Sequence, residues 1–366
     1  MRITHAEIFR FTIPMYPFTI ATGTMDFAQN IFLRIFTDEG MHGVGECSSF
    51  PRRTGETQNT CFAMARDFAP LWREKDPLQI EERMNELNAF TAFNTTIKSA
   101  FEMALFDIAS KLAGKPLYQF LGASQKKALE TDITIGLGDP EEMAAKALEF
   151  RAKGFRILKI KLGKDAKQDL KRLKRIRQAV GDELMLRIDV NQGWDFDSAV
   201  FALQQMEKFN IQFCEQPMSH WDDGLLPELR NLSPIPIMAD ESVFNHYDAI
   251  RLLEAEACNY INIKLSKSGG IHEAIRINKV AEEFHIPCMM GGMLESRLAL
   301  TAFAHVATAL DNIQFYDMDT CMLGHKVDPV TGGVTYNGYL VELPDSPGIG
   351  AEVDEKFLSG LEKVIV

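Results

Sequence analysis

Five ionisable residues recur at even intervals through the middle of this 366-residue chain, each after a short apolar run: Lys161, Asp189, Glu215, Asp240 and Lys264. Successive members lie 24 to 28 residues apart, close to the length of one strand plus one helix. An α/β barrel brings the carboxyl ends of its parallel strands to one mouth, where its active residues lie. The spacing therefore predicts three carboxylates and two lysines at a single site.

The three acidic residues form a candidate metal site. A lone acid at a strand end is more often a helix cap or a loop ion pair, because caps favour Asp. Asp189, Glu215 and Asp240 close successive apolar runs, and three converging carboxylates would repel one another without a cation. Carboxylate oxygens suit Mg²⁺, whereas the eight histidines show no spacing typical of a zinc site. We therefore expect one Mg²⁺ per subunit.

The lysines are candidate bases. Lys159 and Lys161 alternate with Leu158 and Ile160, so both amines leave one face of a strand. Two solvated lysines on an edge strand are the alternative, but helices cover the outside of a barrel strand, so its inner charges are functional or paired. Lys264 lies about halfway round the barrel from Lys161. Two amines on opposite sides of a carbon beside a metal-stabilised carboxylate predict epimerisation through an enediolate.

The apolar pattern predicts the elements that hold these residues. An α+β unit occupies residues 1–122, with antiparallel strands followed by helices. A barrel of the α/β class follows over 123–324, and a tail over 325–366 returns to the first unit. The predicted parallel strands are Thr131–Ile135, Ile157–Lys161, Met185–Asp189, Gln212–Glu215, Ile237–Asp240, Tyr260–Ile263, Pro287–Met290 and Ile313–Phe315. Helical patterns separate them, although none is clear after the last strand.

Composition restricts the location and the partners. A net charge of −12 argues against nucleic-acid binding, and the basic run Lys164–Arg177 is predicted to be the solvated face of a helix. The six cysteines show no CxxC pair, which is typical of reduced, buried thiols. The first residues alternate like a strand, with no leader pattern, and no stretch is apolar enough to span a membrane. We expect a soluble cytoplasmic protein that contacts neither nucleic acid nor membrane.

The series Lys159-x-Lys161, Asp189, Glu215, Asp240 and Lys264, preceded by an α+β unit, resembles the enolase superfamily and its muconate-lactonizing subgroup over essentially the whole chain. The resemblance implies an N-terminal capping domain, completed by the C-terminal tail, over a (β/α)7β TIM-like barrel. It implies that the three acids bind Mg²⁺ and that the two spaced lysines are the paired acid/base catalysts, Lys161 for the R carbon and Lys264 for the S carbon. It further implies that Lys159 steadies the substrate carboxylate and that Glu241 supports the ligand shell.

Two aspartates point to the substrate. Asp317 and Asp319 follow the eighth strand, and alternation aims both carboxylates one way, although a loop or cap pair is the alternative. Two carboxylates beside a pocket would hold an ammonium by charge-assisted hydrogen bonds. This Asp-x-Asp resembles the dipeptide epimerases, in which it grips the free α-amino group. Thr134 matches a position of that family that touches the peptide.

The loop of the first unit should select the second side chain. Between Arg10 and Arg34 there is no Lys or Arg, and the available residues are Tyr16, Phe18, Ile20, Thr24, Met25 and Phe27. Epimerases acting on Ala-Glu are expected to place a cation there. We therefore predict an Ala-Xaa dipeptide with a small or hydrophobic Xaa, epimerised at that residue. Arg52 and Arg53, in the neighbouring loop, keep an Ala-D/L-Glu epimerase open, because either would pair with an acidic side chain.

Other functions are alternatives to dipeptide epimerisation. An N-acylamino acid racemase or an o-succinylbenzoate synthase would use the same metal and lysines, but neither substrate carries the free ammonium that Asp317 and Asp319 would bind. A Schiff-base aldolase needs one lysine in an apolar pocket and no metal triad. A silent barrel that serves as a binding or structural protein is the non-enzyme alternative. Barrels of this kind commonly associate, so a homo-oligomer is possible.

Overall fold

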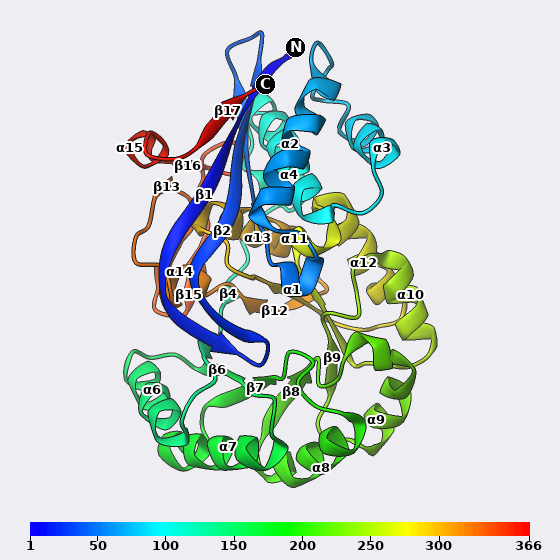
Figure 1. Cartoon of the computed structure of the whole chain (residues 1–366), viewed down its shortest axis with the longest axis vertical. Coiled ribbons are helices and arrows are strands. Elements are labelled where there is room, and N and C mark those ends of the chain that lie inside the picture. Colours follow the sequence, from blue (N-terminus) through cyan, green and yellow to red (C-terminus); the bar gives the residue numbers. More distant parts are fainter.

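Eight parallel strands form one sheet in the computed structural model, which describes residues 1–366 (Figure 1). They are β5 (Ile133–Ile135), β6 (Ile157–Lys161), β7 (Met185–Asp189), β8 (Ile211–Glu215), β9 (Ile237–Ala239), β10 (Tyr260–Ile263), β11 (Cys288–Gly291) and β12 (Ile313–Asp317). Each strand pairs with the next in chain order. The backbone N–H of Asp132, just before β5, donates to the carbonyl of Tyr316 in β12 at 3.2 Å, so the two ends of the sheet also meet. The predicted barrel is confirmed.

Helices cover the outside of the barrel. They are α6 (Pro140–Ala152), α7 (Ala166–Val180), α8 (Phe196–Met206), α9 (Leu226–Leu232), α10 (His246–Glu254), α11 (Leu265–Ser268), α12 (Ile271–Glu283) and α13 (Arg297–Ala309), with only the single turn α14 (Thr320–Leu323) after β12. No helix is both long and apolar enough to cross a membrane. In α7 the basic face is mostly exposed, but Arg177 is buried and donates to the carbonyl of Phe209 at 2.7 Å. The prediction of a wholly solvated basic face was therefore wrong at Arg177.

The capping unit is built on an antiparallel sheet of β1 (Ile3–Ile20), β2 (Gly23–Thr37) and β3 (His42–Ser48). Residues 10 to 34, treated in the sequence as a loop, are mostly the extended hairpin of β1 and β2. Pro14 and Pro17 break the alternation that marks a strand, and the pairing register shifts between Pro14 and Phe18, as a β-bulge does. The hairpin reaches down to the barrel (Figure 1), where Leu137 N–H donates to the Thr19 carbonyl at 2.8 Å.

Helices α1 (Pro51–Thr54), α2 (Gln58–Phe68), α3 (Ile80–Phe90), α4 (Thr95–Leu112) and α5 (Leu117–Phe120) complete this unit. Helix α4 lies directly on β3 because two glycines leave room for its backbone. A Cβ at Gly43 would lie 2.0 Å from the Ala104 carbonyl oxygen, and one at Gly45 would lie 1.9 Å from that of Ala100. One continuous hydrophobic core joins the capping unit to the barrel helices. The cap is therefore packed firmly on the barrel.

The tail contacts both units. β17 (Lys363–Ile365) pairs with residues Glu7–Phe9 of β1 and adds a fourth strand to the capping sheet. Two smaller sheets hold the rest: β13 (Val330–Gly332) pairs with β16 (Ala351–Val353), and β14 (Thr335–Asn337) with β15 (Leu340–Glu342). β15 also pairs with β4 (Leu129–Glu130), which leads into the first barrel strand. The last turn of the tail is α15 (Glu355–Leu358).

Candidate active site

The three predicted metal ligands lie at the carboxyl ends of the adjacent strands β7, β8 and β9. Asp189 is the register partner of Glu215 across the sheet, and Lys161 is the partner of Asp189. All three acids are fully buried. The amine of Lys161 lies 2.5 Å from Asp189 Oδ2, and that of Lys264 lies 2.9 Å from Asp240 Oδ2. The regular spacing in the sequence thus corresponds to direct contacts in the fold.

Lys159 lies between two groups of acids. Its buried amine is 2.6 Å from Asp317 Oδ2, 2.7 Å from Glu215 Oε2 and 3.3 Å from Asp189 Oδ2. Burial alone would lower the pKa of Lys159, but Asp317 and Glu215 outweigh burial and raise it well above its ordinary value. Lys159 is therefore a fixed positive charge, and its contact with a substrate carboxylate stays a prediction.

The buried acids differ in how well neighbouring cations compensate them. Burial opposes ionisation of Asp189, but Lys161 and Lys159 outweigh it and hold the pKa of Asp189 below its usual range. Arg53 and Lys264 likewise outweigh burial at Asp240, whose pKa is well below its ordinary value. The pKa of Glu215 is raised instead, by burial first and then by the charge of Asp189. The protein's own cations thus leave Glu215 without full compensation.

The donor set fits a divalent cation. Carboxylate oxygens are the ligands that Mg²⁺ prefers, and those of Asp189, Glu215 and Asp240 are presented by adjacent strands. Beside them, Glu241 Oε2 and Asn191 Oδ1 are buried acceptors with no hydrogen-bond donor. Burying such acceptors without a partner is costly, so they indicate a missing positive group.

Both candidate bases line one pocket. Lys161 and Lys264 share it with Arg53, Gly292 and an apolar set: Phe18, Ile20, Met25, Phe50, Met293 and Leu294. An adjoining pocket shares Lys161 and adds three of the four predicted substrate residues, Thr134, Asp317 and Asp319, with Met15, Thr320 and Leu323, whereas Lys159 is fully buried and lines neither pocket. The pockets therefore bring together the amines, the acid pair and the apolar side chains of the capping hairpin.

The acid pair lies at the seam between β5 and β12. The backbone N–H of Thr134 donates to Asp319 Oδ2 at 2.6 Å, while Asp317 pairs with Lys159. Burial opposes ionisation of Asp317, but Lys159 and Lys161 outweigh burial and hold the pKa of that carboxyl below its ordinary value. The pKa of Asp319 is raised well above it, by burial and then by Asp317. At this end of the adjoining pocket Asp317 therefore favours its charged form, whereas Asp319 favours its protonated form.

Sequence reasoning left the placement of Arg52 and Arg53 open. The guanidinium of Arg53, whose side chain is 5% exposed, contacts Asp240 and lies 2.8 Å from Glu241 Oε1. Arg52 is exposed and donates to the Thr22 carbonyl at the tip of the hairpin. Arg53, not Arg52, therefore belongs to the pocket that holds the lysines.

Lys267 was not foreseen. It is fully buried, and its amine lies 2.8 Å from Asp240 Oδ1 and 3.0 Å from the Asn262 carbonyl. The Asn262 amide in turn donates to Glu215 Oε1 at 2.8 Å. The only signal was its position one helical turn after Lys264, which does not distinguish a buried lysine from a solvated one.

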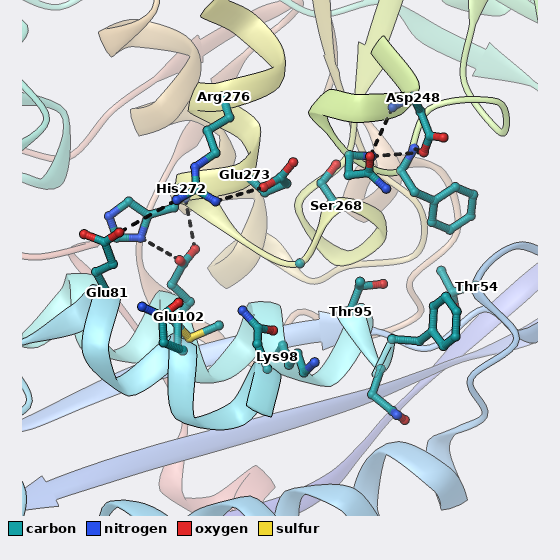
Figure 2. A pocket seen from close by; sticks show the side chains of 18 residues that line it. Thr54, Glu81, Thr95, Lys98, Glu102, Asp248, Ser268, His272, Glu273 and Arg276 are labelled. Atoms are coloured by element: carbon teal, nitrogen blue, oxygen red, sulfur yellow. Dashed lines mark hydrogen bonds and ion pairs between the residues drawn. The ribbon is translucent and has the colours of Figure 1, made fainter. Parts of the chain in front are cut away.

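A larger cavity of about 600 Å³ lies elsewhere, between helices α3 and α4 of the cap and α10 to α12 of the barrel (Figure 2). Its charged side chains already have partners within the protein. Glu102 accepts from His272 at 2.7 Å, and Asp248 accepts the N–H of Phe244 at 2.9 Å before α10. It holds no convergence of amines and acids like that at the strand ends, so we place the candidate active site at the two smaller pockets.

Two family models together account for most of the chain. Residues 3–122 match the mandelate racemase / muconate lactonizing enzyme N-terminal domain, and residues 142–357 match the enolase C-terminal domain-like model. With the barrel, its cap and the strand-end acids and lysines, these matches show that the chain belongs to the enolase superfamily, in the mandelate racemase / muconate lactonizing enzyme family.

Within that family the chain is similar to dipeptide epimerases over its full length. It is 42% identical to the D-Ala-D/L-Ala epimerase of Cytophaga hutchinsonii, across 100% of both chains. It is 38% identical to the L-Ala-D/L-Glu epimerase of Bacillus subtilis, across 96% of each. A crystal structure of the dipeptide epimerase from Cytophaga hutchinsonii, complexed with Mg and the dipeptide D-Ala-L-Val, superposes with a TM-score of 0.98 at 42% identity and 100% coverage of both chains.

Proposed function

We propose that this protein is an Mg²⁺-dependent dipeptide epimerase, an isomerase that inverts the α-carbon of the second residue of an Ala-Xaa dipeptide with a small or hydrophobic Xaa. One observation carries the proposal. Lys161 and Lys264 line a single pocket, and this pocket adjoins the one that contains Asp317 and Asp319. The similarity to epimerases that act on alanine-led dipeptides supports it.

The adjoining pocket would orient the dipeptide. Asp317 and Asp319 would accept hydrogen bonds from its N-terminal ammonium, and Thr134, the register partner of Lys159, would lie beside the peptide. Asp189, Glu215 and Asp240 would hold the Mg²⁺, which when bound would neutralise negative charge on the substrate carboxylate. Lys159 would place a fixed positive charge near that carboxylate. The α-carbon of the second residue would then lie between the two lysines.

The two lysines would move the proton. In one direction a neutral Lys161 takes the α-proton from the R carbon, and a protonated Lys264 delivers a proton to the opposite face. The reverse direction exchanges these roles, with Lys264 serving the S carbon. Lys161 pairs with Asp189 and Lys264 pairs with Asp240, so the two amines are held by different carboxylates of the predicted metal site.

The lining of the lysine pocket favours an apolar side chain. Phe18, Ile20 and Met25 come from the capping hairpin, and burying apolar substrate atoms against them is favourable. Apart from the two candidate bases, the one cation that an acidic side chain would meet in this pocket is Arg53, which is already paired with two carboxylates. Because Arg53 does line this pocket, and because one relative is named an L-Ala-D/L-Glu epimerase, an Ala-D/L-Glu epimerase is the second candidate.

The test is exchange of the α-hydrogen in deuterated buffer, followed by mass spectrometry, for Ala-Ala, Ala-Val, Ala-Met and Ala-Glu. We expect exchange at the second residue that is fastest for the apolar dipeptides and abolished by a chelator. A clear preference for Ala-Glu would refute the apolar assignment. Exchange of N-acylamino acids in preference to every dipeptide would refute dipeptide epimerisation and favour an N-acylamino acid racemase.

We also propose a cytoplasmic location, because all six cysteines are free and five of them are buried. Homo-oligomer formation is proposed from the general behaviour of such barrels. Fractionation of cells and light scattering of the purified protein test the two proposals separately.

A further inference from the structure

A third carboxylate lies beside the acid pair. Asp132 immediately precedes β5, and one oxygen each from Asp132, Asp317 and Asp319 lies within 4.8 Å of the others. The three side chains belong to residues that are 0%, 6% and 2% exposed. The seam of the barrel creates this cluster, because the backbone N–H of Asp132 bonds to Tyr316 in β12 at 3.2 Å.

The cluster has more negative than positive charge. Arg187 donates to Asp132 Oδ2 at 2.8 Å, and Lys159 lies 2.6 Å from Asp317 Oδ2. Asp319 accepts the backbone N–H of Thr134 and has no cationic partner. Asp132 Oδ1 is buried and has no hydrogen-bond donor. Three carboxylates therefore face two closely paired cations, and an uncompensated buried charge is costly.

The surrounding groups determine how that charge is neutralised. Arg187 lies over the rings of Phe213 and Phe315, at 5.1 and 5.3 Å from their centres, and so is fixed below the cluster. Lys159 lies on the metal side, with Lys161 and Lys264 farther out as additional positive charges. Burial and then the charge of Asp317 raise the pKa of Asp132 to about 7. Burial and then Asp317 also raise the pKa of Asp319 well above its ordinary value, so one proton shared among these carboxyls would neutralise the cluster.

We propose that Asp132 is a positioning residue of the ammonium site, and that the cluster exchanges one proton for the N-terminal ammonium of the dipeptide. The proposal rests on the proposed function for the identity of the ligand. The proton leaves for solvent as the ammonium arrives, so the charge of the cluster is unchanged. A primary ammonium suits the site because it brings one positive charge and three N–H donors to three carboxylates.

The test counts protons with a ligand that undergoes no net reaction. Ala-Gly has an ammonium but no second stereocentre, and propionyl-glycine has nearly the same shape without the ammonium. Calorimetric titrations of the Mg²⁺-loaded enzyme near pH 6, in buffers of different ionisation enthalpy, give the number of protons released. We expect proton release on binding Ala-Gly and none on binding propionyl-glycine.

Two variants separate charge balance from structural support. Asp132→Asn leaves two carboxylates facing Lys159 and Arg187, so Ala-Gly should bind roughly tenfold or more weakly, without proton release. Propionyl-glycine should bind as before. Asp132→Asn combined with Arg187→Gln leaves two carboxylates facing one cation. This double variant, which also has no unpaired buried arginine, should recover much of the Ala-Gly affinity and the proton release.

Several results would overturn the proposal. One is equal proton release on binding Ala-Gly and propionyl-glycine. Another is an equal loss of affinity for both ligands in Asp132→Asn. A third is a folded double variant that does not recover affinity for Ala-Gly. A second equivalent of bound Mn²⁺ that disappears in Asp132→Asn would also overturn it, because the cluster would then be a metal site. Exchange of Ala-Val tests the proposed function independently. If no dipeptide exchanges, the comparison of Ala-Gly with propionyl-glycine still shows whether the cluster binds an ammonium.

Discussion

The guanidinium of Arg53, from helix α1 of the capping unit, is paired with the carboxylate of Asp240, at the end of barrel strand β9. The same guanidinium lies 2.8 Å from Glu241 Oε1. This is a direct ionic contact between the cap and the predicted metal ligands. It places a positive charge from one unit where a divalent cation would bind in the other.

Replacing Arg53 should therefore change metal affinity. In Arg53→Met the competing charge is absent, and Mg²⁺ should bind about tenfold more tightly, because like charges a few ångströms apart repel by on the order of 1 kcal/mol or more. Titration calorimetry with Mg²⁺ measures this directly. Arg52→Met is the matched control, because Arg52 is exposed and bonds only to the Thr22 carbonyl. Equal effects of both substitutions would contradict the predicted competition.

Removing either candidate base should stop inversion. Lys161→Ala and Lys264→Ala should each lower the rate of epimerisation by about 10²- to 10⁴-fold, which is the usual contribution of a positioned acid or base. Polarimetry or chiral chromatography of Ala-Val follows the reaction. Lys164→Ala, at an exposed lysine three residues after Lys161, should react like the unmodified protein. Inversion at the normal rate in either active-site variant would remove that lysine from the mechanism.

A cation in the apolar pocket should redirect specificity. Met25 lies on β2 and lines the pocket that both lysines share. In Met25→Arg the kcat/KM for Ala-Glu should rise, and that for Ala-Met should fall, because the guanidinium pairs with a carboxylate and is poorly accommodated by an apolar side chain. Phe27→Arg, on the same strand but outside this pocket, is the control. No change in the ratio of the two values would show that the hairpin does not contact the second residue.

A buried histidine should make the fold sensitive to acid. His305 is fully buried, with Nδ1 accepting the N–H of Tyr118 and Nε2 donating to the Ile349 carbonyl, and burial lowers its pKa from 6.5 to about 4. Because the folded pKa is below the unfolded one, this contribution to stability is complete above pH 6.5 and is lost as the pH falls through about 4. The difference corresponds to about 3 kcal/mol.

Urea unfolding at pH 7, 5 and 4 measures that dependence. His305→Gln should lose less stability than the unmodified protein over this range, while His285→Asn, at an exposed histidine, should behave like the unmodified protein. Parallel losses in all three proteins would assign the acid sensitivity to other groups.

The sequence predicts the barrel and its main acids and lysines well, because parallel strands convert regular spacing along the chain into proximity at one mouth. Asp189, Glu215 and Lys161 are register neighbours for this reason. Arg53 and Asp132 could not be placed in the same way. Arg53 reaches the acids from another unit, and Asp132 is set beside Asp317 only by the seam of the barrel.

The extent of the capping hairpin was missed for a local reason. Pro14 and Pro17 interrupt the apolar alternation, and only pairing with β2 shows that β1 continues to Ile20. Buried lysines such as Lys267 raise a different difficulty. Their role depends on a carboxylate 27 positions away, and the pattern around them is the same as that of a solvated helix turn.

The pairing of β17 with β1 also orders events during synthesis on the ribosome. Residues Glu7–Phe9 emerge first, yet the strand that covers their edge, Lys363–Ile365, emerges more than 350 positions later. Until then the nascent chain carries an open strand edge, a surface on which unfinished proteins aggregate. The topology therefore leaves this edge open to other strands until the last residues of β17 are made.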